Sequence, residues 1–360
     1  MNRSIPPRES FKLTTGSRLH FGLFRFAPKP IMAGHAATDR SLEHPRDLQG
    51  VSDQAPWFGG LGLMIQDPAT SIAFAPETKF VIQDDATGRV IEFAERWFRS
   101  AQSTQATKLV DIRSVAELPV RVSVQLSPPQ HSGLGAGTQL ALAVGQGLTK
   151  FFFDMELAPQ ELAQWVGRGL RSAIGTHGFF RGGLIVDRGK LHSQELGTLD
   201  GAFQLPDAWR VVLITRNDPS VFHGSRELQA FRDLPEIPSS STQKLQQLAR
   251  EVILPAVWAN DHDAFAQAIY EYGWIAGNCF AQIQGGPFAS SRAEWWVAHL
   301  RKLGFPGIGQ SSWGPTLYCF APDPDRASWL AARVSDSLQH PSESVLVTRP
   351  QVGPYQIDPL

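Results

Sequence analysis

The chain of 360 residues is 42% hydrophobic and carries a formal net charge of −1, with 33 basic and 34 acidic side chains. This balance leaves no electrostatic footprint for nucleic acid or an anionic membrane as a partner, and no apolar run approaches the ~20 residues of a membrane span. We therefore expect a two-domain globular protein that acts on a small molecule and, because the N-terminus lacks an apolar signal region, resides in the cytoplasm.

The first patterned segment covers residues 11–26 and has the sequence FKLTTGSRLHFGLFRF, which predicts an extended strand. Arg18 and His20 alternate with apolar neighbours, so both point to the same face of that strand. The pair gives a polar, cationic face able to meet an anion, and an ordinary solvated face fits the same alternation. Residues 27–57 show no clear period and predict a long loop, which in a compact domain is usually functional or disordered.

Short strands and one amphipathic helix are expected next. The strands are predicted at residues 58–66, 71–75 and 80–83, where apolar and β-branched residues cluster between turn signals. The helix is predicted over residues 87–102 from apolar residues at three-and-four spacing. A further half-buried strand at residues 119–125 leads into the most informative part of the chain.

The central motif begins at Pro128 with the sequence PPQHSGLGAGTQLALA and runs into a helix expected over residues 138–148. Two prolines end the preceding strand, and glycine then stands at every second position of a short loop. Strand, glycine-rich loop and helix together form an anion cradle, because loop amides and the helix N-terminus both present N–H groups to a ligand. Ser132 and Thr138 add hydroxyls for a phosphate oxygen or a metal-bound water. A plain glycine-rich turn before a core helix is the simpler alternative.

Two other nucleotide-binding loops fit this motif less well. A Rossmann fingerprint would need a third glycine where Thr138 stands, although Asp154 lies at the distance of a ribose-binding acid. A Walker loop is excluded because the Gly-Lys-Ser/Thr ending is missing.

After a helix expected at residues 159–169, a second glycine-rich stretch covers residues 167–187, GRGLRSAIGTHGFFRGGLIVD. Arginines on such a loop suit bidentate binding of a phosphate or carboxylate, and merely solvated arginines on a turn are the alternative. The polar residues singled out in this stretch are Arg168, Arg171, Thr176, His177 and Arg181.

The remainder of the chain alternates helix and strand patterns, which predicts an α+β arrangement. A buried strand at residues 209–215 is expected to open the second domain. Helices are predicted over residues 242–259, 263–283, 290–303 and 325–338, and strands at the end of the loop 304–321 and at 344–349.

Three separated motifs, SRLHFG, PPQHSGLGAGTQLALA and GIGQSSWGPT, occur in the order of the three motifs of the GHMP kinase superfamily. With GRGLRSAIGTHGFFRGGLIVD between the second and the third, the chain resembles the β-ribofuranosylaminobenzene 5′-phosphate synthases of that superfamily. The resemblance extends from about Phe11 to Arg349 and leaves residues 27–57 as an insertion. It implies a GHMP-kinase-like two-domain fold, with a domain like ribosomal protein S5 domain 2 over residues 1–205 and a ferredoxin-like domain over residues 206–360.

The resemblance also implies the reaction. Phosphoribosyl pyrophosphate is expected to join 4-aminobenzoate with release of CO2 and pyrophosphate, in tetrahydromethanopterin biosynthesis, with Mg²⁺, no organic cofactor and a homodimeric enzyme; the metal ligands are left unassigned. The expected catalytic residues are Thr138, Arg171 and His177. The expected substrate-binding residues are Arg18, His20, Ser132, Gly133, Leu134, Gly135, Ala136, Gly137, Gln139, Thr176, Arg181, Gln310, Ser311 and Ser312.

Two departures from the kinases of the superfamily favour the synthase. Those kinases commonly have Ser-Ser-Ala after GLG, whereas residues 136–139 are Ala-Gly-Thr-Gln, and the region of their catalytic aspartate here has the sequence GTHGF. No acid stands there to take a hydroxyl proton. An ATP-dependent small-molecule kinase and a catalytically inactive ligand-binding member stay open as alternatives. ATP turnover with a polyol or amine acceptor would favour the first, and tight binding without product the second.

Overall fold

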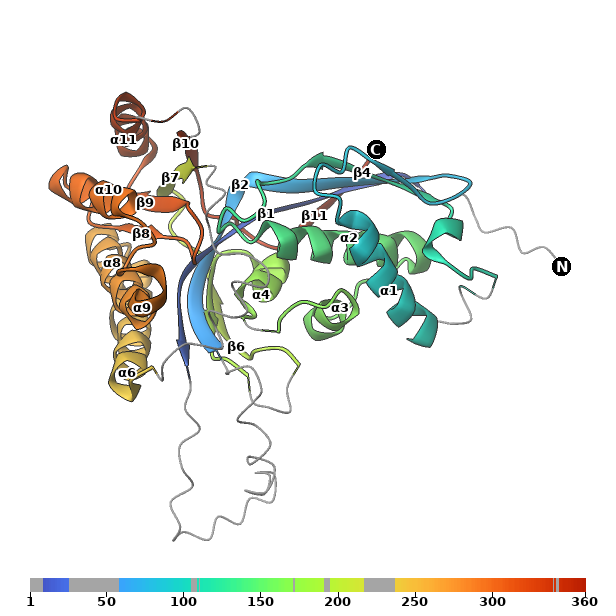
Figure 1. Cartoon of the computed structure of the whole chain (residues 1–360), viewed down its shortest axis with the longest axis horizontal. Coiled ribbons are helices and arrows are strands. Elements are labelled where there is room, and N and C mark those ends of the chain that lie inside the picture. The colour runs from blue at the N-terminus through green and yellow to red at the C-terminus, as the bar shows by residue number, and fades with distance from the viewer. Residues whose placement is uncertain are drawn as a thin grey trace, which may run out of the picture.

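The computed structural model describes residues 9–25, 58–104, 109, 111–170, 172–190, 195–216, 237–338, 340 and 343–360. Their strands form two sheets that lie side by side, each with its own helices (Figure 1). Among the described helices, none combines the length and the apolar character that crossing a membrane requires.

The first sheet is built around two long antiparallel strands, β1 and β2, which stay paired over most of their length with register shifts that bend them. Its strands are β1 (Phe11–Arg25), β2 (Phe58–Pro76), β3 (Val81–Gln83), β4 (Val120–Leu126), β5 (Leu184–Asp187), β6 (Leu199–Phe203) and β11 (Gln356–Pro359). The order β11-β1-β2-β4-β3 forms one path, and β5 joins β2 to β6. The helices beside it are α1 (Val90–Thr104), α2 (Ala136–Phe153), α3 (Pro159–Trp165) and α4 (Ile174–Arg181), with a short 3-10 turn at Val115–Glu117.

The second sheet has the order β10-β7-β9-β8, with β7 (Arg210–Arg216), β8 (Ile308–Gln310), β9 (Leu317–Ala321) and β10 (Glu343–Thr348). Its helical segments are α6 (Ser239–Gln247), η5 (Leu248–Ile253), α7 (Leu254–Trp258), α8 (His262–Cys279), α9 (Ala281–Gln284), α10 (Ser291–Lys302) and α11 (Pro324–Asp336). Strand β7, helices, β8, β9, α11 and β10 thus follow one another as a split βαβ unit, which confirms the expected ferredoxin-like arrangement.

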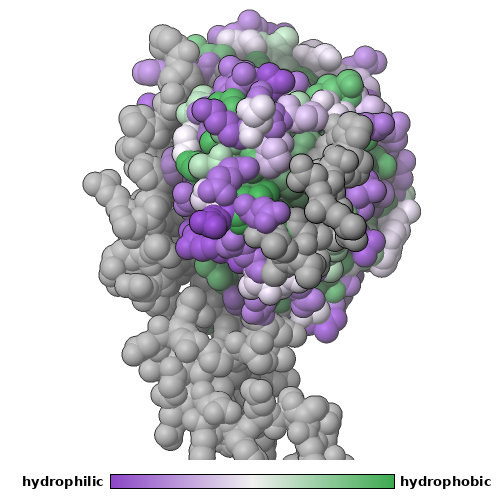
Figure 2. Space-filling view, turned by 90° about the vertical axis from the view of Figure 1, so that its right-hand side faces the viewer, coloured by the Kyte–Doolittle hydropathy of each residue, from purple (hydrophilic) through white to green (hydrophobic). Residues whose placement is uncertain are grey.

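Alternating side chains of β7 show how this sheet is covered on both faces. Val212 and Ile214 pack with α10 and α11, whereas Val211 and Leu213 belong to a core that also contains Leu19 of β1. One continuous apolar core therefore joins the two sheets. A separate core fills the space between the first sheet and helices α1 and α2. The end of the molecule seen in Figure 2 is mainly hydrophilic, with hydrophobic residues in small scattered groups.

Two predictions about elements were wrong. The strands expected at residues 58–66 and 71–75 are one strand, because β1 pairs with β2 on both sides of the interruption. The stretch 167–187, expected as a glycine-rich loop, contains α4 and β5. Its glycines serve close packing: a Cβ at Gly178 would lie 2.5 Å from Met64.

The expected division of the chain at residues 205 and 206 stays a prediction. Strand β11, from the end of the expected second domain, pairs with β1 in the first sheet. The expected insertion, residues 27–57, lies outside the described residues.

Candidate active site

The central motif forms the loop before α2 and the first turn of that helix. Gly135 takes the N-cap position with φ +73°, in the left-handed region, and as glycine it offers no side-chain acceptor to the helix amides. The amides of Thr138 and Gln139 donate to the Gly135 carbonyl. The amides of Ala136 and Gly137 have no acceptor among the described residues. The first turn of α2 therefore presents N–H groups in the manner of an anion site.

The SRLHFG motif meets this loop through Arg18. Its backbone amide donates to the Leu134 carbonyl at 2.8 Å. Its guanidinium lies against the glycine N-cap, since a Cβ at Gly135 would be 3.2 Å from Arg18 Nε. A fixed positive charge therefore stands beside the N-terminus of α2.

The GIGQSSWGPT motif closes the arrangement from the second sheet. Ser311 is fully buried; its hydroxyl donates to the Gly133 carbonyl at 2.7 Å and accepts from the His20 amide at 3.0 Å. The Ser312 amide donates to the His20 carbonyl at 2.9 Å. The backbone of Gly314 packs on Gly133 so closely that neither position has room for a Cβ. Three motifs far apart in sequence thus meet at one place.

Two arginines flank the first turn of α2 on its other side. A Cβ at Gly137 would lie 2.8 Å from Arg89 Nη1 and 3.8 Å from Arg168 Nη2. Both guanidiniums lie 4.9 Å from the centre of the Phe93 ring. Arg168 belongs to the arginine cluster noted in the sequence. Arg89 was missed, because nothing near it in sequence shows that α1 packs beside α2.

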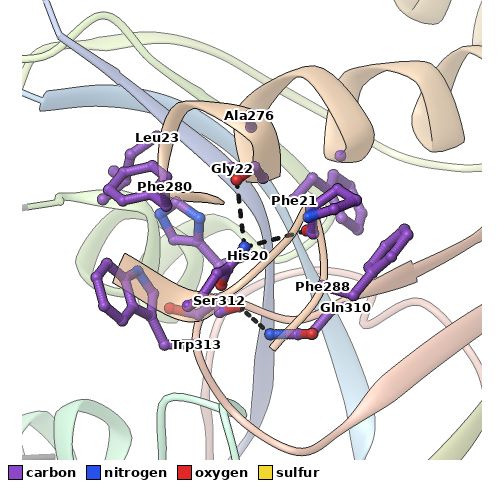
Figure 3. Close-up of a pocket in the computed structure, with 14 residues that line it drawn as sticks. His20, Phe21, Gly22, Leu23, Ala276, Phe280, Phe288, Gln310, Ser312 and Trp313 are labelled. Atoms are coloured by element: carbon purple, nitrogen blue, oxygen red, sulfur yellow. Dashed lines mark hydrogen bonds between the residues drawn. The ribbon is translucent and has the colours of Figure 1, made fainter. Parts of the chain in front are cut away.

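A pocket lies next to this meeting point, with lining residues from β1, α8 and the Gln310–Trp313 segment. Leu23, Phe280 and Trp313 lie on one side of it and Phe288 and Gln310 on the other (Figure 3). Its lining combines the aromatic residues Phe280, Phe288 and Trp313 with polar residues, of which His20 is one. Such a wall suits a small aromatic molecule.

The His20 side chain is buried, and burial first, with the Arg18 charge second, holds its pKa well below the ordinary value. The imidazole is therefore neutral near pH 7. The sequence predicted a cationic face formed by Arg18 and His20. The structure corrects this prediction, because of the two side chains only Arg18 carries a positive charge near pH 7.

Several expected site residues use their polar atoms within the protein. The Ser132 hydroxyl donates to the Pro129 carbonyl at 2.8 Å. The His177 Nε2 lies 2.7 Å from the Gly197 carbonyl, and burial lowers its pKa. The Gln139 amide group accepts from the Thr15 hydroxyl and donates to the Gly175 carbonyl. The Gln310 side chain accepts from the Ala289 amide and donates to the Ser312 carbonyl.

The remaining expected residues lie at different distances from the α2 N-terminus. Thr138 is in its first turn, in contact range of Gly175 at the start of α4. Thr176 is buried, and its hydroxyl has no partner among the described residues. Arg181 ends α4, about 9 Å along the axis from Gly175, and is exposed. Arg171 lies outside the described residues. The catalytic and binding roles assigned to all of these stay predictions.

Solved structures of other proteins share this fold. The chain is 13% identical to mevalonate diphosphate decarboxylase from Staphylococcus aureus, with a TM-score of 0.62 over 97% of this chain and 98% of that one. It is 12% identical to a homoserine kinase from Cytophaga hutchinsonii, with a TM-score of 0.58 over 99% of both chains. These identities show the fold alone, and the fold is that of the GHMP kinase superfamily.

Curated relatives give a narrower comparison, and no family model matches the chain. The chain is 26% identical over 295 residues to the β-ribofuranosylphenol 5′-phosphate synthase of Methanothermobacter thermautotrophicus, covering 76% of this chain and 83% of the relative. The synthases of the same name from Methanocaldococcus jannaschii and Archaeoglobus fulgidus are 27% and 28% identical, and cover 73% and 72% of this chain. The matches extend over 82% and 79% of those two relatives. The chain is thus similar to synthases that have the expected type of product, a ribofuranosyl arene 5′-phosphate.

Proposed function

We propose that this protein is a pentosyltransferase that joins phosphoribosyl pyrophosphate to a para-substituted benzoate, with release of CO2 and pyrophosphate. The observation that carries the proposal is the meeting of all three motifs at an α2 N-terminus with a flanking arginine, directly beside a pocket with aromatic walls. One part of the site suits a diphosphate and the other an arene. The similarity to three named synthases supports the same assignment.

The chemistry follows from the charges that change. The bond between the anomeric carbon and pyrophosphate breaks with its electron pair on the leaving group, so negative charge grows there while the sugar carbon becomes cationic. Amides of the first α2 turn, together with Arg18, Arg89 and Arg168, are fixed positive dipoles and charges for that leaving group. Their preorganisation is the protein's main contribution in this account.

The arene supplies the new bond. Its ring carbon that carries the carboxylate attacks the anomeric carbon, with electrons donated by the amino or hydroxyl group opposite. The bond to the carboxylate then breaks, CO2 leaves, and the electron pair restores the aromatic ring. No ring proton has to be removed, so the absence of acidic residues from the first turns of α2 and α4 is compatible with the reaction. A kinase that needs a carboxylate there to take up a hydroxyl proton fits less well.

The acceptor is proposed as 4-aminobenzoate. The relatives are named as synthases of a ribofuranosylphenol, which favours 4-hydroxybenzoate as a second candidate, because its decarboxylation leaves a phenol. Both acceptors present the same carboxylate, ring and para donor group to the pocket.

Mg²⁺ is proposed to enter with the diphosphate, since Mg²⁺ in proteins is commonly held through substrate phosphates. The described residues contain no group of three His, Cys, Asp or Glu side chains able to hold a metal ion, which fits an ion carried by the substrate. The Thr138 hydroxyl, in the first turn of α2, is our candidate for a contact to its water shell. Mg²⁺ would offset part of the diphosphate charge.

The same proposal includes three further points. The protein acts in the cytoplasm, it takes part in tetrahydromethanopterin biosynthesis, and it forms a homodimer.

Incubation with phosphoribosyl pyrophosphate, Mg²⁺ and each carboxyl-labelled benzoate in turn tests the proposal. Labelled CO2 should be released without ATP from at least one of the two acceptors, and the ratio of kcat/KM ranks them. A strict requirement for ATP, with ADP as a product, would replace the synthase by a kinase.

A further inference from the structure

Gln284, the last residue of α9, lines the aromatic pocket, and its amide group has a fixed orientation. Its Nε2 donates to the carbonyls of Gly277 at 3.2 Å, Gly286 at 2.9 Å and Pro287 at 3.1 Å. With the amide turned over, Oε1 would face three carbonyl oxygens, and no hydrogen would lie between them. The nitrogen therefore points to these carbonyls, and the oxygen points away from them.

The oxygen of this amide is left to interact with a ligand. Among the described residues, Gln284 Oε1 has no hydrogen-bond partner. It is not enclosed by protein either, because the buried side-chain atoms that lack a partner do not include it. An accessible amide oxygen on a pocket wall can accept a hydrogen bond from a ligand and cannot donate one.

The other polar side chains of the pocket are less selective. Both amide atoms of Gln310 bond within the protein. The Ser312 hydroxyl and the His20 imidazole can each donate or accept a hydrogen bond. Among the described side chains of this wall, Gln284 thus has the oxygen that is left to accept only, and it favours a ligand group that carries a hydrogen.

Strand β1 shows which end of the pocket Gln284 occupies. Arg18 lies against the glycine N-cap of α2, and a Cβ at Gly22, four residues later, would overlap Ala276 of α8. At about 3.3 Å per residue, these two points of β1 are up to about 13 Å apart. The residue after Ala276 is the one whose carbonyl holds Gln284 at 3.2 Å, and Figure 3 shows Ala276 on the opposite side of the pocket from Ser312. Gln284 is therefore attached to the end of the pocket that is farther from the anion site.

We propose that Gln284 is a specificity-determining residue, whose Oε1 accepts a hydrogen bond from the para amino or hydroxyl group of the aromatic substrate. This inference rests on the proposed function for the identity of that substrate. The contact orients the arene, with its para group at the far end of the pocket and its carboxylate carbon toward the sugar. A benzoate without a hydrogen to give at the para position leaves the amide oxygen without water and without a partner, which weakens its binding.

Binding of two benzoates tests the inference without turnover. Isothermal titration calorimetry in the presence of Mg²⁺ and pyrophosphate compares 4-aminobenzoate with 4-methylbenzoate, which has nearly the same size but no hydrogen to give at the para position. We expect Gln284→Met to lower the ratio of the two affinities about three- to tenfold, the size of one hydrogen bond. Gln282→Met, which changes an exposed side chain of the same helix, is the matched control and should keep the wild-type ratio.

A second variant, Gln284→Lys, separates the loss of the acceptor from a displacement of the loop. The lysine ammonium has three hydrogens for the three carbonyls but no acceptor atom. It should therefore lose the preference for 4-aminobenzoate as Gln284→Met does. An unchanged affinity ratio in Gln284→Lys would overturn the inference, whatever the methionine variant does, because Gln284 would then only support the loop.

The assay for labelled CO2 keeps this result separate from the proposed function. Loss of the preference in both Gln284 variants of a protein that releases no CO2 would support the para contact and count against the proposed reaction. CO2 release together with an unaffected ratio would do the reverse. A protein that binds neither benzoate, with or without Mg²⁺ and pyrophosphate, would overturn the para contact together with the arene part of the proposed function.

Discussion

Arg18 is the side chain whose loss should separate binding from folding most clearly. It stands beside the glycine N-cap of α2, where we propose that the leaving diphosphate gains charge. Arg18→Ala should remove a charge-assisted contact of about 1.5–3 kcal/mol, or roughly a tenfold to hundredfold loss in kcat/KM for phosphoribosyl pyrophosphate. Steady-state kinetics and the melting temperature of the ligand-free protein measure the two effects.

The control for this variant is Arg333→Ala, which removes an exposed arginine from α11. It should leave the kinetics unchanged. A sharp fall in melting temperature for Arg18→Ala with intact saturation and turnover would make Arg18 a structural residue and remove it from the site.

Gly135 can be tested against another glycine with the same backbone demand. Gly135 and Gly88 have φ of +73° and +66°, so alanine is strained at both, by about 1–2 kcal/mol. A Cβ at Gly135 would also press on Arg18, whereas one at Gly88 meets nothing within 4 Å. Gly135→Ala should therefore lower kcat/KM at least about tenfold beyond Gly88→Ala at similar stability. Equal activity of the two variants would move the diphosphate away from the α2 cap.

Titration of Asp187 should make the free energy of unfolding depend on pH. Burial raises its pKa from 3.8 to about 6, so the folded chain binds this proton more tightly than the unfolded chain. Its contribution to stability is fully present below about pH 3.8 and is lost as pH rises through about 6, a change of about 3 kcal/mol. His20, whose pKa is lowered, acts with the opposite sign below about pH 6.5.

Urea unfolding of the wild type and Asp187→Asn between pH 4.5 and 7.5 isolates the contribution of Asp187. The asparagine variant should gain stability relative to the wild type as the pH rises, because the cost of the buried charge falls on the wild type alone. Parallel curves would show that Asp187 does not titrate in this range.

The sequence could predict the position of a residue only within a motif whose own residues determine the local backbone conformation. The glycine loop before α2 is of this kind. Arg89 could not be placed, because its contact with Gly137 arises only when α1 packs on α2. Ser172 is similar, since only the fold brings its hydroxyl to within 3.3 Å of His20 Nε2.

At the scale of elements, the N-terminus of α2 lies beside Arg89, which directly precedes α1, and we expect both to bind the same anion. Arg89→Ala should weaken product inhibition by pyrophosphate about three- to tenfold, because one charge beside the helix dipole is lost. Arg99→Ala, on the exposed side of the same helix, is the control and should have no effect. If both variants behave alike, Arg89 serves α1 through its ion pair with Glu92 and not the anion site.

Helices and strands were predicted correctly where the hydrophobic periodicity and the capping residues pointed to the same element. The helix expected over residues 290–303 is α10, and the hydroxyl of its N-cap residue Ser290 accepts from the Ala293 amide. It failed for α4, because glycine usually marks turns, whereas Gly175 and Gly178 there allow close helix packing. Strand β11 was also missed, since its partner β1 lies at the other end of the sequence.

On the scale of the whole molecule, the site depends on how the two sheets are joined. Leu19 of β1, Tyr272 of α8 and Phe320 of β9 belong to one core, and Ser311 ties the second sheet to the central loop. The proposed diphosphate site therefore comes mainly from the first sheet and its helices, and the aromatic pocket from β1 and the second sheet. The sequence could indicate the glycine-rich anion site and the late motif that lines the pocket separately. That the two lie side by side depends on the tertiary structure.

The central claim is that sugar transfer and decarboxylation occur together at this border. The most direct measurement follows pyrophosphate and labelled CO2 in the same reaction, with phosphoribosyl pyrophosphate, Mg²⁺ and a carboxyl-labelled benzoate and without ATP. The account predicts equal amounts of both products and a ribosylated arene that has lost its carboxyl group. Pyrophosphate release without CO2, or no product until ATP is added, would contradict it.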